Sequence, residues 1–161
     1  NGVIFAKEAV LRVQGTVQGQ YSLGVSGSTT SKGKVFLDDD IVYNTNPKTN
    51  PNSTDLLGII AQNDVMITNN VPNHTSINIY ASIYSQQGGF GAENYDTRGV
   101  SGSINLYGGI QQSIRRAVGT FSGSTIVSGF NKLYMYDDRF ATVSPPFFPG
   151  TGAFQVVSWY E

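Results

Sequence analysis

The sequence predicts an all-β protein built as a β-solenoid, a stack of short coils whose neighbouring strands pair in parallel. Three observations support this prediction. Apolar residues come in short bursts rich in Val, Ile, Leu, Phe and Tyr, and helix signals are scarce. Gly or Asn follows most bursts almost at once, as expected at tight corners. Several bursts begin twelve residues apart, as at Leu11, Leu23 and Val35.

The expected strands are these bursts in chain order. Pairs such as Leu11/Val13 and Ile77/Ile79 place two apolar side chains on one face, which is typical of a strand. The burst at 56–68 resembles a helical turn, but Gly58 and the NDVMI that follows favour strand–turn–strand. The predicted strands are 3–6, 10–15, 20–27, 34–43, strands within 56–68, 76–85, 100–113, 117–127, 132–137 and 153–160.

Two segments interrupt the pattern and are expected to project from the stack as loops. Segment 44–55, NTNPKTNPNSTD, has two X-Pro steps and no apolar anchor. Segment 86–102 is a second excursion, which we expect Phe90 and Tyr95 to tether. With coils of roughly 18–24 residues, the chain would form about six coils.

A β-sandwich is the alternative fold, because sandwiches also have short strands and frequent turns. The sequence lacks the two-residue Asn-Gly or Asp-Gly loops that join long alternating strands in hairpins. This absence favours the solenoid without deciding between the two.

Composition narrows the classes of function. The 161 residues suggest one domain, 1–161, and the abrupt strand-like start suggests a fragment of a longer protein. Only 13% of residues are charged and the net charge is −1, with no basic run to capture nucleic acid. The absence of cysteine excludes disulfides, thiolate metal sites and a cysteine nucleophile. No apolar run is long enough to span a membrane, so we expect no membrane contact within the chain.

Several ordered stretches together resemble the β-solenoid domain of unknown function in bacterial pilin-like and type IV pilus assembly proteins of the PilX kind. They include GTVQGQYSLGVSG (15–27), LDDDIVY (37–43), STDLLGIIAQNDVMI (53–67), GSINLYGGIQQSIRRAVGTF (102–121) and GFNKLYMYDDRF (129–140). The resemblance extends through PPFFPGTG (145–152) and VVSWYE (156–161). It implies a right-handed parallel β-helix, an extracellular or cell-surface location, and no enzymatic activity or cofactor.

Asp38-Asp39-Asp40 is the one candidate metal site. In a strand, Asp38 and Asp40 would face one way and could offer two carboxylates to Ca²⁺. Calcium needs six to eight oxygen ligands, and no D-x-D-x-D-G loop is present. We therefore assign no metal, and expect a charged strand that resists sticking to other chains.

A cluster of charged residues near the end of the chain is expected to be a structural polar anchor. Its members are Arg115, Arg116, Asp137, Asp138 and Arg139. Adjacent side chains on a strand point apart, so we predict that Arg115 or Arg116 pairs with Asp137 or Asp138. Two neighbouring carboxylates on opposite faces do not form the pair across a cleft that glycoside hydrolysis requires. We assign no catalytic residue to the chain.

Large side chains lie on both faces of the expected last strand, 153–160, and Trp159 and Tyr160 form a possible contact surface. The sequence favours a non-enzymatic structural or adhesive module whose partners are pilus or cell-envelope proteins, with surface glycans as a second class. A carbohydrate-binding β-helix and a polysaccharide-acting β-helix enzyme are the alternatives. A cleft where Asp, Lys and Arg converge would favour the enzyme, and an exposed aromatic ladder would favour sugar binding.

Overall fold

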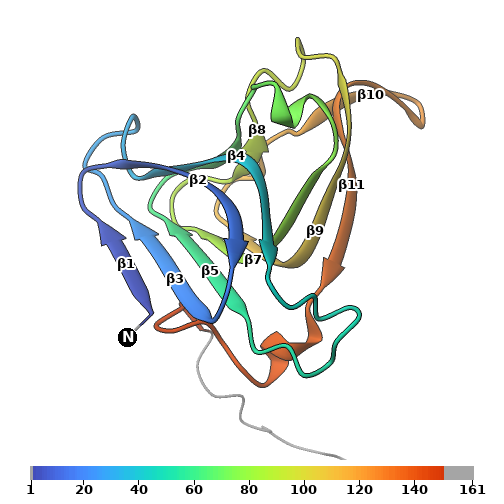
Figure 1. The fold of residues 1–161 in the computed structure, drawn as a ribbon. Coiled ribbons are helices and arrows are strands. Elements are labelled where there is room, and N and C mark those ends of the chain that lie inside the picture. Colours follow the sequence, from blue (N-terminus) through green and yellow to red (C-terminus); the bar gives the residue numbers. More distant parts are fainter. Residues whose placement is uncertain (1, 151–161) are drawn as a thin grey trace, which may run out of the picture.

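The structure is a computed structural model that describes residues 2–150, and it is a β-solenoid of about five turns (Figure 1). Two short 3₁₀ turns, η1 (Pro72–His74) and η2 (Asp138–Ala141), accompany the strands. The strands are β1 (Val3–Ala6), β2 (Val10–Val17), β3 (Gln20–Val25), β4 (Lys34–Tyr43), β5 (Leu56–Ala61), β6 (Val65–Ile67), β7 (Ile77–Ser85), β8 (Phe90–Ala92), β9 (Val100–Gln112), β10 (Gly119–Ser122) and β11 (Thr125–Tyr136).

Successive coils lie on one another and form three faces. The first face contains β1, β3, β5 and the C-terminal halves of β7 and β9. The second contains the start of β2, the start of β4, β6 and β8. The third contains the ends of β2 and β4, the starts of β7 and β9, and β11. Coils one to five begin on the first face at Val3, Gln20, Leu56, Ser82 and Gly109.

Parallel pairing rejects the sandwich alternative. Among the strands of residues 2–150, every pairing is parallel except that of β10 with β11. That one exception is a hairpin that extends from the last coil (Figure 1). A sandwich would instead need two facing antiparallel layers.

Aliphatic ladders fill the interior, as the alternating pattern predicts. On the first face Ile4, Leu23, Ile59, Ile83 and Ile110 occupy consecutive rungs in register. Ile59 and Ile83 are fully buried and Leu23 is partly buried, whereas Ile4 is 56% exposed because no coil covers it among the described residues. The core is therefore closed along its sides and less covered at its ends.

Five coils form rather than the six expected, because most coils are longer than roughly 18–24 residues: the starts at Gln20, Leu56, Ser82 and Gly109 are 36, 26 and 27 residues apart. Segment 86–102 is not one excursion: it contains β8, and Phe90 is buried in the core. Segment 117–127 turns back between β10 and β11 rather than running as one strand. The predicted strand 153–160 lies outside the described residues.

Glycine is required at one sharp corner, where β9 passes from the third face to the first. Gly108 has φ +154°, and a Cβ there would collide with the Ala81 carbonyl oxygen of the preceding coil. The backbones of the two coils can approach this closely only because residue 108 lacks a side chain. Within residues 2–150, no helix has the length and apolar character needed to cross a bilayer.

Candidate functional site

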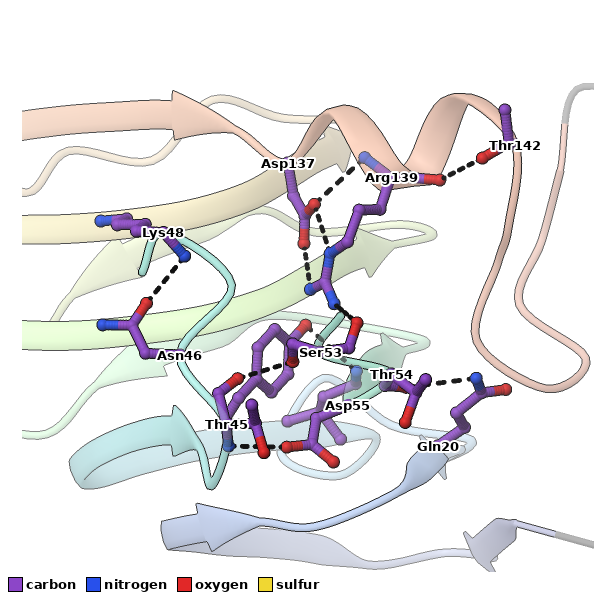
Figure 2. Close-up of polar contacts among 12 residues, drawn as sticks. Gln20, Thr45, Asn46, Lys48, Ser53, Thr54, Asp55, Asp137, Arg139 and Thr142 are labelled. Atoms are coloured by element: carbon purple, nitrogen blue, oxygen red, sulfur yellow. Dashed lines mark hydrogen bonds and ion pairs between the residues drawn. The ribbon is translucent and has the colours of Figure 1, made fainter. Parts of the chain in front are cut away.

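Asp137 and Arg139 form a largely buried ion pair just after β11 (Figure 2). Arg139 donates from Nη2 to Asp137 Oδ2 at 2.6 Å and from Nε to Oδ1 at 2.9 Å. Its Nη1 donates to the Ser53 carbonyl oxygen at 2.8 Å. The hydrogen bond with Asp137 raises the pKa of Arg139 above its ordinary value. The pair therefore ties the chain after β11 to the base of loop 44–55.

The base of loop 44–55 is closed by further hydrogen bonds (Figure 2). Asp55 accepts from the backbone N–H of Gly19 at 2.6 Å and from that of Thr45 at 2.8 Å. The Ser53 hydroxyl donates to the Thr45 carbonyl oxygen at 2.6 Å. Hydrogen bonds to a charged acceptor are roughly twice as strong as neutral ones, so Asp55 holds the base of the loop closed.

Loop 44–55 folds back over the third face. The Lys48 ammonium lies 5.2 Å from the ring centre of Tyr80 and 4.9 Å from that of Tyr107. Tyr43, Tyr80 and Tyr107 form an edge-to-face ladder, and the Arg139 guanidinium lies over Tyr43. Lys48 thus covers the tyrosine ladder that could otherwise have offered an open platform for sugar rings.

The predicted pairing of Arg115 or Arg116 with Asp137 or Asp138 is wrong. Asp137 pairs with Arg139 because η2 turns the chain back and brings the guanidinium to a carboxylate two residues away. Arg116 binds a different carboxylate, and Arg115 and Asp138 are exposed. The expected opposite orientation of the two aspartates is confirmed, since Asp137 is buried and Asp138 is exposed.

Asp38 and Asp40 bind neighbouring coils. Asp38 accepts two hydrogen bonds from Arg12, at 2.8 and 2.7 Å, and one from the Thr68 hydroxyl at 2.6 Å. Asp40 accepts from both the backbone N–H and the side-chain amide of Asn78, each at 2.7 Å. Within residues 2–150, no group of three or more His, Asp or Glu side chains is arranged to hold a metal ion. The hydrogen bonds give both carboxylates a structural role.

Asp64 joins four successive coils, an arrangement that we call the Asp64 clamp (Lys34, Asp64, Gly89 and Arg116). Its carboxylate lies 3.2 Å from Lys34 Nζ and accepts from Arg116 Nε at 2.9 Å and from Gly89 N–H at 3.1 Å. Burial alone would raise the pKa of Asp64, but the bonds from Gly89, Arg116 and Lys34 together lower it. The carboxylate therefore stays ionised, which stabilises the stack but does not suit a general acid.

The last strand exposes four large side chains in a row, which we call the β11 surface (Leu133, Tyr134, Met135 and Tyr136). Their exposed fractions are 60%, 43%, 55% and 55%. From Asn131 to Tyr136, β11 pairs with β9 on one edge, and no strand of the described chain pairs with the other edge. Backbone groups and apolar side chains are thus available together.

Sequence reasoning missed the Asp64 clamp and the position of Lys48 on the tyrosines. Residues 34, 64, 89 and 116 recur at intervals of one coil, but the coils are unequal and no regular spacing marks them. The only feature of the sequence that could have predicted the clamp is the presence of oppositely charged residues about one coil apart. The predicted contact residues Trp159 and Tyr160 lie outside the described residues. Comparison of the chain with family models, curated protein sequences and solved structures gives no match.

Proposed function

We propose that this chain is a non-enzymatic structural and interaction module, of the adhesion type, in a pilin-like or pilus-assembly protein at the bacterial cell surface. The β11 surface supports this proposal most directly. An edge strand with free backbone groups can accept an extended segment of a partner, and alternating side chains then provide specificity. Soluble proteins usually cover or charge such an edge. Lys132 charges this edge at one position, but the four large side chains that follow it are apolar or aromatic, which favours a partner.

The use of the carboxylates supports the non-enzymatic part of the proposal. Asp38, Asp40, Asp64 and Asp137 each accept hydrogen bonds from groups that hold coils or turns together. A catalytic pair would need carboxylates directed at a substrate, one of them with a raised pKa. The pKa of Asp64 is instead lowered.

The proposed location and partners depend on the sequence. The resemblance to PilX-type solenoids points to the cell surface and to pilus or envelope proteins as partners. A surface rich in Ser, Thr, Asn and Gly with few charges suits an extracellular rod. The net charge of −1 gives no reason to expect nucleic acid.

Binding of the labelled protein to envelope fractions of the encoding bacterium tests the proposal. We expect binding that protease treatment of the envelopes abolishes and that periodate oxidation of their glycans leaves intact. The variant Leu133→Lys/Met135→Lys should lose binding, because two ammonium groups oppose strand addition. Lys7→Met, at an exposed position between β1 and β2 in the first coil, away from β11, is the control.

Two outcomes would contradict the proposal. Full binding by the double lysine variant would show that the β11 surface is not the contact. Turnover of any polysaccharide in a reducing-end or unsaturated-product assay would refute the non-enzymatic assignment.

A further inference from the structure

A groove of about 470 Å³ lies on the outer side of the second face, next to the Asp64 clamp. Its floor contains Phe36 and Met66, which are adjacent in register on β4 and β6. The next position in register, on β8, is Gly91, whose missing side chain leaves room for Arg116 to pack against it. The volume lies in the range of sites for small molecules, about 300–1,000 Å³.

Charged and polar side chains line the walls in balanced numbers. Lys34 and Arg116 supply two positive charges, and Asp64 and Glu93 supply two negative charges. Arg12, which lies over Phe36, forms an ion pair with Asp38, so this neighbouring pair adds no net charge. Asn94 adds an amide to the same wall as Glu93. A ligand of either net charge would meet groups of its own sign, so the groove selects a ligand with no net charge.

The wall groups are held in place before any ligand binds. Arg116 Nε and Lys34 Nζ both contact Asp64, at 2.9 and 3.2 Å. Glu93 accepts a hydrogen bond from the backbone N–H of Asn69 at 3.0 Å. Arg116 makes no hydrogen bond through its two terminal amino groups to other residues within 2–150, so these remain donors for a ligand. Fixed donors and acceptors reduce the entropy lost on binding.

We infer that this groove binds an uncharged saccharide. The Arg12 guanidinium lies over the Phe36 ring, 5.2 Å from its centre, so the apolar C–H face of a sugar ring would pack on Met66 and on the part of Phe36 that Arg12 leaves open. The sugar hydroxyls both donate and accept hydrogen bonds. Arg116 and Lys34 supply donors to these hydroxyls, and Glu93 supplies an acceptor. A ligand without polar groups would instead desolvate the four charged side chains without giving them hydrogen-bond partners. The groove is formed by β4, β6 and β8, whereas the β11 surface belongs to β11. A test can therefore refute sugar binding in the groove without refuting partner binding at the β11 surface, and the reverse.

Titration of the ¹⁵N-labelled protein with cellohexaose, mannohexaose and maltohexaose tests the inference by NMR. With at least one of them, we expect saturable shifts of the backbone amides of Met66, Gly91 and Glu93. Phe36→Ala should weaken binding about tenfold, which corresponds to about 1.4 kcal/mol. Glu93→Gln keeps the shape of the wall and should weaken binding even if Phe36→Ala does not fold. Leu133→Lys/Met135→Lys should bind sugar as the unaltered protein does.

Several results would overturn the inference. One is the absence of shifts in these amides at about 10 mM of each sugar, which would mean that binding is weaker than about −2.7 kcal/mol. Another is unchanged affinity in both groove variants. Stronger binding of oligogalacturonate that weakens with added salt would refute the argument from balanced charge.

Discussion

Replacement of Arg139 by Met tests whether the Asp137–Arg139 pair anchors the end of the solenoid. The change keeps an unbranched apolar side chain and removes the guanidinium, so Asp137 loses its ion pair and the Ser53 carbonyl loses a donor. Breaking a buried pair by removing one partner costs about 3–5 kcal/mol. A fifth of the Arg139 side chain is exposed, and Asp137 keeps the 3.1 Å bond from the Arg139 backbone N–H. We therefore expect the unfolding free energy to fall by about 2–3 kcal/mol, just below the range for a fully buried pair.

Urea denaturation followed by circular dichroism measures this change, and thermal unfolding should show a Tm lower by about 4–12 °C. Arg115→Met is the matched control, because Arg115 is exposed and was one of the wrongly predicted partners of Asp137. It should alter stability by no more than about 0.5 kcal/mol. A loss below about 1 kcal/mol in Arg139→Met, or equal losses in both variants, would refute the reasoning.

Three further predictions concern the stack itself. Gly108→Ala should lower the free energy of unfolding, measured by urea denaturation, by about 1–3 kcal/mol, because its Cβ meets the Ala81 carbonyl. Gly99→Ala is the control, because a Cβ there lies in open space, and it should lower the free energy by about 0.5 kcal/mol or less. The pKa of Asp64 is lower in the folded protein than in the unfolded chain, so its contribution to stability is present above the unfolded value of about 3.9 and is lost as pH falls through the folded value. Asp64→Asn should accordingly flatten the loss of unfolding free energy on acidification below about pH 5, and an unchanged pH profile would contradict this. Ile83→Ala removes a fully buried rung and should cost about 2–5 kcal/mol by the same denaturation assay, and a loss under about 1 kcal/mol would mean that the rung is not tightly packed.

The charged groups of this protein serve mainly to join coils. Three sets of polar contacts connect residues of successive coils across an outer face. They are the pair of Arg12 with Asp38, the pair of Asp40 with Asn78, and the Asp64 clamp. In a solenoid each coil contacts only its neighbours, so such links add to the interface between coils. The two proposed binding surfaces lie on different parts of the stack. The groove lies on the second face, and the β11 surface lies on the last strand.

The strands could be predicted from the sequence because alternation is a local property of the chain. Segment 34–43 forms β4 with the predicted bounds, and Ile77 and Ile79 point into the core with no exposed surface. Segment 56–68 divides into β5 and β6 as expected from Gly58 and the turn after it. Side chains two apart on a strand share a face whatever the rest of the fold is.

The partners of the charged residues were decided by the tertiary structure. Asp64 and Arg116 are 52 residues apart, and Arg139 and Ser53 are 86 apart. These residues meet only after the register between coils is set, and loops of unequal length make that register unreadable from spacing. Thus the sequence by itself determined that short strands would bury aliphatic ladders, and it favoured a solenoid over a sandwich. Stacking of the coils then determined which charges would meet, where a groove would form and which strand of residues 2–150 would lie at the edge.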